Sequence, residues 1–479
     1  MSVYVGNIIY NKRYLMPQQN DFSKGNIPRT VTRLAIPMIA AMLVNALYSV
    51  VDRIYIGHLE DVGQLALTGI GLCYPITMSV TAFSYLVGNG GGPLTSILRG
   101  AGDDEGAEKI LGNSITLLVA LGIIVPAVCL LIKEPILYLF GASDATYPYA
   151  NAYITIYLLG SISVMLTLGL NPFLNAQGFT RIGMMTVLIG AVCNIVLDPV
   201  FIFVFDMGVS GAAIATVISQ TVSAVWVILF LLGKKNLIRV RVKNLKPEVK
   251  TIRRITSLGF SSFVMSITEA AVSAVFNASL SQLGGDIYVT VMTVATSVSQ
   301  VVHLPMNGFA QGAQPVTGYN YGAGQYGRVK ESFRFLTKFC VTYAVVAWAL
   351  LMLFPAQIIS IFNNDAQLIA TAVPMFRIFF CMNFIMSLQM AAQNTFVAME
   401  ESKKATFFAL YRKVILLIPL TLILPRIGFG VAGVFAAEPV ADTISAVTCF
   451  TVFMLTAYKK LGKLGQQDVR GTSVLHRPK

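Results

Sequence analysis

The stretch GNGGGPLTSILRGAG spans residues 88–102, and a counterpart, AQGAQPVTGYNYGAG, spans residues 310–324. The two align without a gap at an offset of 222 residues, which places Pro93 on Pro315. The same register holds elsewhere at Gly100 and Gly322, Ile136 and Ile358, Phe140 and Phe362, Gly208 and Gly430, and Ser223 and Ser445. A register that persists through both halves of a very apolar chain predicts a transporter built from two structural repeats.

The composition indicates a membrane protein. Of the 479 residues, 55% are hydrophobic and only 12% are charged, and the mean hydropathy is +0.70. An ordinary soluble chain is about 25% charged. Apolar runs of about 20 residues, long enough to cross a bilayer, recur throughout the sequence. Period-2 alternation is absent, and lipid requires every backbone polar group to be satisfied internally, so we expect helices.

We therefore expect an all-α polytopic membrane protein with twelve transmembrane helices in two six-helix lobes. The expected spans are about 34–57, 65–98, 109–132, 148–172, 180–205, 209–232, 254–283, 287–321, 331–355, 368–398, 405–426 and 431–458. The expected domains are an N-terminal tail (1–33), an N-lobe (34–232), a basic linker (233–253), a C-lobe (254–458) and a C-terminal tail (459–479). Because six is even, both lobes enter the membrane from the same side, and an axis along the membrane normal relates them.

The basic residues predict the orientation of the chain. With the N-terminus in the cytoplasm, all but four of the 35 Lys and Arg residues fall on the cytoplasmic side. The connection between the tenth and eleventh spans contributes four to this count, and the exceptions are Arg53, Lys133, Arg377 and Arg426. Cytoplasmic loops collect Lys and Arg, so we expect a multi-pass protein of the cytoplasmic membrane with both termini cytoplasmic. The positive charge then reports topology, and we expect no nucleic-acid partner.

The terminal and linker segments add little chemistry. Residues 1–33 are polar and basic, so we expect no cleavable signal peptide. We expect a disordered tail up to about Gln19, with Met16 as an alternative start. The linker carries nine Lys and Arg between Lys234 and Arg254, and we interpret it as a connection that lies on anionic headgroups. The six cysteines lie in apolar segments without short spacing, which favours buried thiols over disulfides or metal ligands.

Ionisable groups inside the spans are the candidate functional residues, because they are expensive in a membrane. Asp52 lies near the outer end of the first span, and Asp198 lies near the outer end of the fifth. At 1.5 Å per residue, both carboxylates and Thr216 share a depth of roughly 8–10 Å below the outer edge. Further polar groups on the same helix faces are Asn45, Tyr48 and Asn194.

Two carboxylates at one level in a low dielectric cannot both stay ionised unless a cation joins them. Protonation, or Na⁺ capture at Asp52 and Asp198, would then switch the charge of this bundle. The alternative is structural: Asp52 pairs with Arg53, and Asp198 caps a broken helix before Pro199. We expect no structural metal and no cofactor.

The second half carries a different set of acids. Glu269 lies near the middle of the seventh span, and Glu438 and Asp442 lie four residues apart on one face of the twelfth. Glu269 could bind a cation, couple to a proton or pair with a cationic substrate, and Arg377 is a possible counter-ion for all three acids. At the 222-residue offset, Asp52 falls on Ala274 and Asp198 on Leu420, so the halves share a backbone plan but not a charge plan.

Three segments carry a resemblance to a known family. They are Ile36-Pro37 with Leu47-Tyr48-Ser49-Val50-Val51-Asp52, then Asn194-Ile195-Val196-Leu197-Asp198-Pro199, and finally Pro305 through Gln314-Pro315 with Gly318-Tyr319-Asn320-Tyr321-Gly322-Ala323. In these segments, and over residues 30 to 460, the chain resembles the multidrug and toxic compound extrusion (MATE) family. The sequence of the fifth span is similar to that of the prokaryotic DNA-damage-inducible-like branch of the family, within the multidrug/oligosaccharidyl-lipid/polysaccharide exporter superfamily.

The resemblance implies a V-shaped antiporter that exports amphipathic organic cations in exchange for H⁺ or Na⁺. It implies that Asp52 is the coupling carboxylate and that Asn45, Asn194, Asp198 and Thr216 complete its polar cluster. Glu269 matches the seventh-helix glutamate of the Na⁺-linked branch. The tenth span lacks that branch's carboxylate and offers Gln389 and Gln393 instead, which favours coupling in the N-lobe.

Other functions predict other residues. A flippase for a lipid-linked oligosaccharide or polysaccharide needs a basic central cavity, yet the predicted spans hold almost no basic residues apart from Arg53 and Arg377. A membrane-embedded enzyme needs converging catalytic groups, and His58, His303 and His476 are scattered, so we expect no enzyme. A channel would not need duplicated halves with prolines inside the spans. We expect a monomer whose partners are the bilayer and small organic cations or drugs.

Overall fold

The structure is a computed structural model, and it describes residues 21–57, 59, 63–233, 236–362 and 365–464. Within these ranges all regular structure is helical, and twelve helices are long and apolar enough to cross a membrane. This confirms the all-α class and the number of spans. The tail expected up to Gln19 and most of the C-terminal tail lie outside the described residues.

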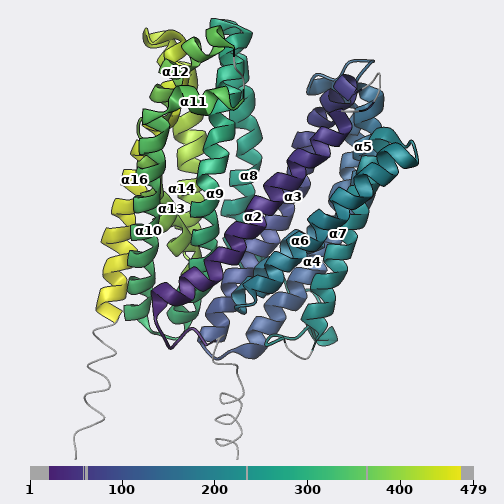
Figure 1. Cartoon of the computed structure of the whole chain (residues 1–479). Helices are drawn as coiled ribbons and strands as arrows, with labels where there is room; N and C mark the ends of the chain where they lie inside the picture. The colour runs from purple at the N-terminus through teal and green to yellow at the C-terminus, as the bar shows by residue number, and fades with distance from the viewer. Residues whose placement is uncertain (1–20, 58, 60–62, 234–235, 363–364, 465–479) are drawn as a thin grey trace, which may run out of the picture.

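The helices form two bundles (Figure 1). The first contains α2 (Ile27–Gly57), α3 (Gly63–Gly100), α4 (Asp104–Leu139), α5 (Tyr147–Ala176), α6 (Thr180–Pro199) with the π-helical turn η2 (Val200–Val204), and α7 (Gly208–Leu232). The short 3₁₀ turn η3 (Val242–Leu245) follows and leads into the second bundle.

The second bundle begins with three long helices, α8 (Val249–Gly284), α9 (Asp286–Gly322) and α10 (Tyr326–Leu353), and the short α11 (Pro355–Ser360). The tenth span consists of α12 (Ala366–Phe380), η4 (Asn383–Ile385) and α13 (Met386–Ala398). The eleventh consists of α14 (Ser402–Leu410), the π-helical η5 (Tyr411–Leu417), α15 (Ile418–Ile423) and η6 (Leu424–Ile427). The last consists of α16 (Gly430–Phe453) and η7 (Met454–Tyr458) and stays helical to residue 464.

Repeated glycines end or begin the helices at equivalent places in the two halves. Gly102 follows α3 with φ +78°, and its repeat mate Gly324 follows α9 with φ +72°. Gly208 opens α7 with φ +52°, and its mate Gly430 opens α16 with φ +54°. A positive φ strains residues that carry a Cβ. The sequence repeat therefore preserves the positions at which the backbone must turn.

The two bundles meet where α2 begins and α16 ends, and their axes diverge toward the opposite end (Figure 1). At the junction α3 crosses α8 at backbone contact distance. A Cβ on Gly259 would lie 1.8 Å from the carbonyl oxygen of Leu86, and one on Gly90 would lie 2.1 Å from that of Ile255. Only glycine permits this approach.

The reciprocal crossing joins α2 to α9. A Cβ on Gly312 would lie 2.6 Å from Cα of Ala35, and Gly312 is the repeat mate of Gly90. The glycines of residues 88–92 and 308–312 thus let the helices pack closely. Within the junction α3 and α9 also approach at backbone contact distance, at Gly100 and Gly322.

The segment before α2 fills the junction of the bundles. Phe22 is fully buried, with its ring 5.6 Å from that of Tyr319 and 6.0 Å from the Arg99 guanidinium. Its carbonyl oxygen accepts hydrogen bonds of 3.0 Å from Asn320 Nδ2 and from Arg328 Nη2. Phe22 therefore contacts α3 of one bundle and α9 of the other, and it stabilises their contact.

The described part of the linker packs against the first bundle. Gln177 Oε1 accepts from the backbone nitrogen of Ile238 at 2.9 Å, and Asn113 Oδ1 accepts from that of Glu248 at 2.7 Å. Arg241 also pairs with Glu108 at 2.6 Å. This segment is fastened to α4 and α5 rather than only resting at a membrane surface. All six cysteines are free thiols, but only Cys73, Cys340 and Cys449 are buried, and the other three are half-buried.

We predict that Gly259→Ala destabilises the junction, because the new Cβ would overlap the Leu86 carbonyl group. Overpacking of this kind costs about 1–3 kcal/mol. The matched control is Gly71→Ala in α3, where nothing lies within 4 Å of the added Cβ. After a heat challenge in detergent, size-exclusion chromatography should recover less monodisperse Gly259→Ala than wild type and an unchanged fraction of Gly71→Ala. Equal recovery of all three proteins would contradict the packing interpretation.

Candidate functional site

The N-lobe acids come from α2 and α6, which pack against each other. Asp198 is fully buried and precedes Pro199, where α6 gives way to the π-helical turn η2. Asn194, one turn earlier, donates from Nδ2 to Asp198 Oδ1 at 3.0 Å. The Asp198 carboxyl group is also close enough to that of Asp52 for the two negative charges to interact. The structure thus brings together the two carboxylates that the sequence places at one depth.

This group contains oxygen atoms that have no hydrogen-bond partner. They are Oδ1 of Asp52, Oδ2 of Asp198 and Oδ1 of Asn194, and each is buried. Among the described residues no ion pair joins Asp52 or Asp198 to a Lys or Arg. Buried acceptors are normally satisfied, so these oxygens have the capacity to hold a proton or a small cation. Two neighbouring carboxylates in a low dielectric cannot both stay ionised unless a proton or a cation joins them.

A polar cavity of about 30 Å³ lies beside the carboxyl pair, between α2, α5, α6 and α7. Four of the predicted residues line it, namely Asn45, Tyr48, Asn194 and Thr216. The volume is enough for ordered water, which needs roughly 10–15 Å³ of accessible space and polar partners. Neither acid lines this cavity, but Asn194 does and also bonds to Asp198, so it connects the cavity to the carboxyl pair.

Sequence reasoning missed part of this cavity. The further polar residues that line it are Thr167, Thr186, Ser219, Gln220 and Ser223. Ser219 Oγ and Gln220 Oε1 are buried without hydrogen-bond partners. A signal was present in α7, where Thr216, Ser219, Gln220 and Ser223 follow helical spacing in an apolar span.

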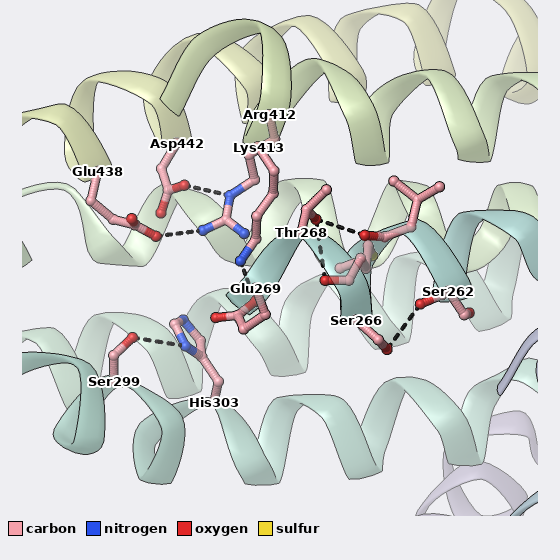
Figure 2. Close-up of polar contacts among 12 residues, drawn as sticks. Ser262, Ser266, Thr268, Glu269, Ser299, His303, Arg412, Lys413, Glu438 and Asp442 are labelled. Atoms are coloured by element: carbon pink, nitrogen blue, oxygen red, sulfur yellow. Dashed lines mark hydrogen bonds and ion pairs between the residues drawn. The ribbon is translucent and has the colours of Figure 1, made fainter. Parts of the chain in front are cut away.

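The C-lobe acids form an ion-pair network with two cations of η5 (Figure 2). Arg412 donates from Nε to Asp442 Oδ1 at 2.5 Å and from Nη2 to Glu438 Oε1 at 2.9 Å. Lys413 Nζ pairs with Glu269 Oε2. The network joins α8, η5 and α16, and it includes all three acids that the sequence identifies in this half.

Two expectations about the basic residues are wrong. Arg412 and Lys413, counted with the cytoplasmic connection, are buried inside the span Ser402–Ile427, so the spans are not nearly free of basic residues. Arg377 is exposed on α12 and is not the partner of Glu269, Glu438 or Asp442 in the described ion pairs. Acids inside spans need nearby cations. In the structure Arg412 and Lys413 meet this need.

The tenth-span amides lie one helical turn from this network. Gln389, which is buried, donates from Nε2 to Gln393 Oε1 at 3.3 Å, and its own Oε1 has no hydrogen-bond partner. Gln393 in turn reaches Met265 Sδ at 3.5 Å, and Met265 precedes Glu269 by four residues on α8. Gln393 of α13 therefore contacts α8 one turn before Glu269, and neither amide bonds to Glu269 in the described contacts.

We predict that Arg412→Met strongly destabilises the C-lobe, because it leaves the buried Asp442 carboxylate without its partner. Breaking a buried ion pair costs about 3–5 kcal/mol. The double variant Arg412→Met with Asp442→Asn removes both charges and should recover much of the loss. Thermal unfolding of the purified protein measures both effects. A double variant no more stable than the single one would contradict a structural role for this pair.

The chain is similar to known proteins over most of its length. A family model described as MatE matches residues 37–200 and 261–423, one segment in each half. Multidrug export protein MepA of Staphylococcus saprophyticus is 26% identical over 434 residues, which cover 91% of this chain and 95% of the relative. MepA of Staphylococcus aureus strain NCTC 8325 is 25% identical with the same coverage.

Solved structures share the fold. A MATE protein in the bent conformation has a TM-score of 0.88 at 22% identity, covering 95% of this chain and 100% of that chain. A transporter of the MOP superfamily from Pyrococcus furiosus, described as having a binding pocket of reverse polarity, has a TM-score of 0.86 at 23% identity, with 94% and 99% covered. At these identities the likeness concerns the fold alone.

Proposed function

The chain belongs to the multidrug and toxic compound extrusion (MATE) family, and from this premise we propose that it exports amphipathic organic cations by proton-coupled antiport. Family membership identifies a multi-pass membrane transporter rather than an enzyme. The MepA relatives, which are multidrug export proteins by name, align over nearly their whole length. They support a small-molecule drug as the cargo.

The proposal of proton coupling rests on the proximity of Asp52 and Asp198. Their carboxyl groups meet, no ion pair to a described Lys or Arg neutralises them, and two of their oxygens are unpaired. A proton shared between them satisfies this pair, and its loss leaves two like charges that repel each other. Proton binding and release therefore change the force between α2 and α6. Na⁺ held by the same oxygens is the alternative coupling ion.

The polar cavity provides the route for exchange with this pair. Asn45, Tyr48, Asn194 and Thr216 line it, and water within it would connect these groups to the carboxyls by hydrogen bonds. In this scheme α2 and α6 move when the carboxyl pair changes its protonation, and η2 absorbs the change, because π-helical turns are frequent at functional sites.

Alternating access follows from the arrangement of the bundles. The bundles meet at one end and diverge toward the other (Figure 1), and described glycines line the crossings of α3 with α8 and of α2 with α9, so the bundles can rock about this junction. The distribution of Lys and Arg favours a cytoplasmic location for the junction and for both termini. Prolines inside spans, such as Pro37 in α2 and Pro305 in α9, supply bending points.

A lipid-linked oligosaccharide or polysaccharide flippase remains the alternative in the same superfamily, and the buried Arg412 and Lys413 bear on it. A pyrophosphate cargo needs cations that are free to bind it. Both of these cations are instead paired with carboxylates. The network as a whole contains three acids and two bases, which favours cationic cargo over anionic cargo.

We predict that Asp52→Asn abolishes gradient-driven export, because an amide cannot take up and release the coupling proton. Inside-out vesicles should load the fluorescent cation ethidium when a pH gradient is imposed, and the variant should lose most of this uptake, about tenfold or more. Asp144→Asn, a change at an exposed loop residue, is the matched control. A Na⁺ gradient in place of the pH gradient identifies the ion. Undiminished uptake by Asp52→Asn would exclude Asp52 as the coupling residue.

A further inference from the structure

The pair formed by Lys413 and Glu269 is unlike the other ion pairs of the C-lobe. The Glu269 side chain is 53% exposed, whereas that of Lys413 is only 7% exposed. The acids that bind Arg412 are far less accessible, at 18% for Glu438 and 5% for Asp442. Glu269 is therefore the one carboxylate of this network that a molecule from outside could reach, and the ammonium group lies behind it.

His303 of α9 also lies beside the pair formed by Lys413 and Glu269. Figure 2 shows the His303 ring on the same side as the Glu269 carboxyl group, with Lys413 approaching from η5. His303 Nδ1 lies 3.2 Å from Ser299 Oγ, and its buried Nε2 has no hydrogen-bond partner. Arg412 is already bonded to Glu438 and Asp442, so Lys413 is the cation that neutralises Glu269.

We propose that Lys413 is a tethered competitor of the cargo: it occupies Glu269 when the transporter is empty, and an organic monocation binds Glu269 only by displacing it. This inference rests on the export of organic cations proposed above. Because Lys413 is part of the chain, its effective concentration at Glu269 is high and constant. It lowers the affinity for cargo, and its return to Glu269 speeds the release of cargo after transport.

The charge balance supports this assignment. The cationic cargo and the Lys413 ammonium group carry like charges and repel each other strongly in a partly buried site. Both therefore cannot pair with Glu269, and Lys413 loses its partner while cargo is bound. The displaced ammonium group is costly to bury, which drives it back to the carboxylate. An exporter needs such a device, since cargo held too tightly is not released at the far side.

The test separates binding from turnover. Ethidium binding to the purified wild type and to Lys413→Met is measured by fluorescence anisotropy, and the export rate is measured in inside-out vesicles. We expect Lys413→Met to bind ethidium about tenfold more tightly and to export it with a lower maximal rate. Loss of a merely structural contact would not tighten binding. Lys413→Arg, which keeps the charge, should behave like wild type.

Two further variants make the outcome specific. Lys133→Met removes one positive charge from α4, where Lys133 bonds only to Thr155 among the described contacts, and should leave binding unchanged. Adding Glu269→Gln to Lys413→Met should abolish the gain in affinity, and this neutral pair also guards against misfolding of the single variant. Unchanged or weaker binding by Lys413→Met, in a wild type that exports ethidium, would overturn the role of Lys413 alone. A wild type that neither binds nor exports ethidium would overturn this role and the proposed function together.

Discussion

The close contact between the backbones of α3 and α8, and of α2 and α9, is the constraint on which the rest of the molecule depends. At Gly90, Gly259 and Gly312 the neighbouring helix lies where a Cβ would be. Without an aqueous hydrophobic drive between helices in lipid, such contacts supply much of the association. They fix the junction of the bundles and leave the opposite ends separate, and in the proposed scheme the bundles rock about this junction.

The two halves share a backbone arrangement but differ in how their buried acids are neutralised. In the first half, Asp52 and Asp198 lie close together, and no described ion pair joins either of them to a Lys or Arg. In the second half, the chain supplies its own cations, because Arg412 and Lys413 pair with Glu438, Asp442 and Glu269. In the proposed scheme, the first site responds to the ion gradient and the second responds to a competing cation. Coupling and cargo recognition can therefore reside in different lobes.

Much of the fold was predictable because its causes are local. Apolar runs and the repeat at 222 residues predicted the twelve spans, and helical spacing predicted that Asp52 and Asp198 share one depth. Arg412 and Lys413 lie inside the predicted span 405–426, but they were counted with the preceding connection, because basic residues usually mark the cytoplasmic end of a span. Their partners on α8 and α16 are distant in sequence, so only the tertiary packing shows that the ion pairs are internal.

The polar cavity illustrates the same limit. Tyr48 and Asn194 could be placed on their helix faces from spacing, but the contribution of Thr167 depends on how α5 packs against α7. Helical periodicity gives the face of each helix, and the packing of the glycines decides which faces meet. Residues whose role arises only from that meeting carry no separate mark in the sequence.

The central claim is that a proton held by Asp52 and Asp198 is exchanged for cargo. The most direct measurement counts the protons released when the purified protein binds ethidium in a weakly buffered solution, with a pH indicator or by calorimetry in buffers of different ionisation enthalpy. Linkage requires release from the wild type, about one proton for each cation bound. The account predicts this release from the wild type and none from a variant in which both acids are amides. Binding of ethidium without any proton release from the wild type would contradict it.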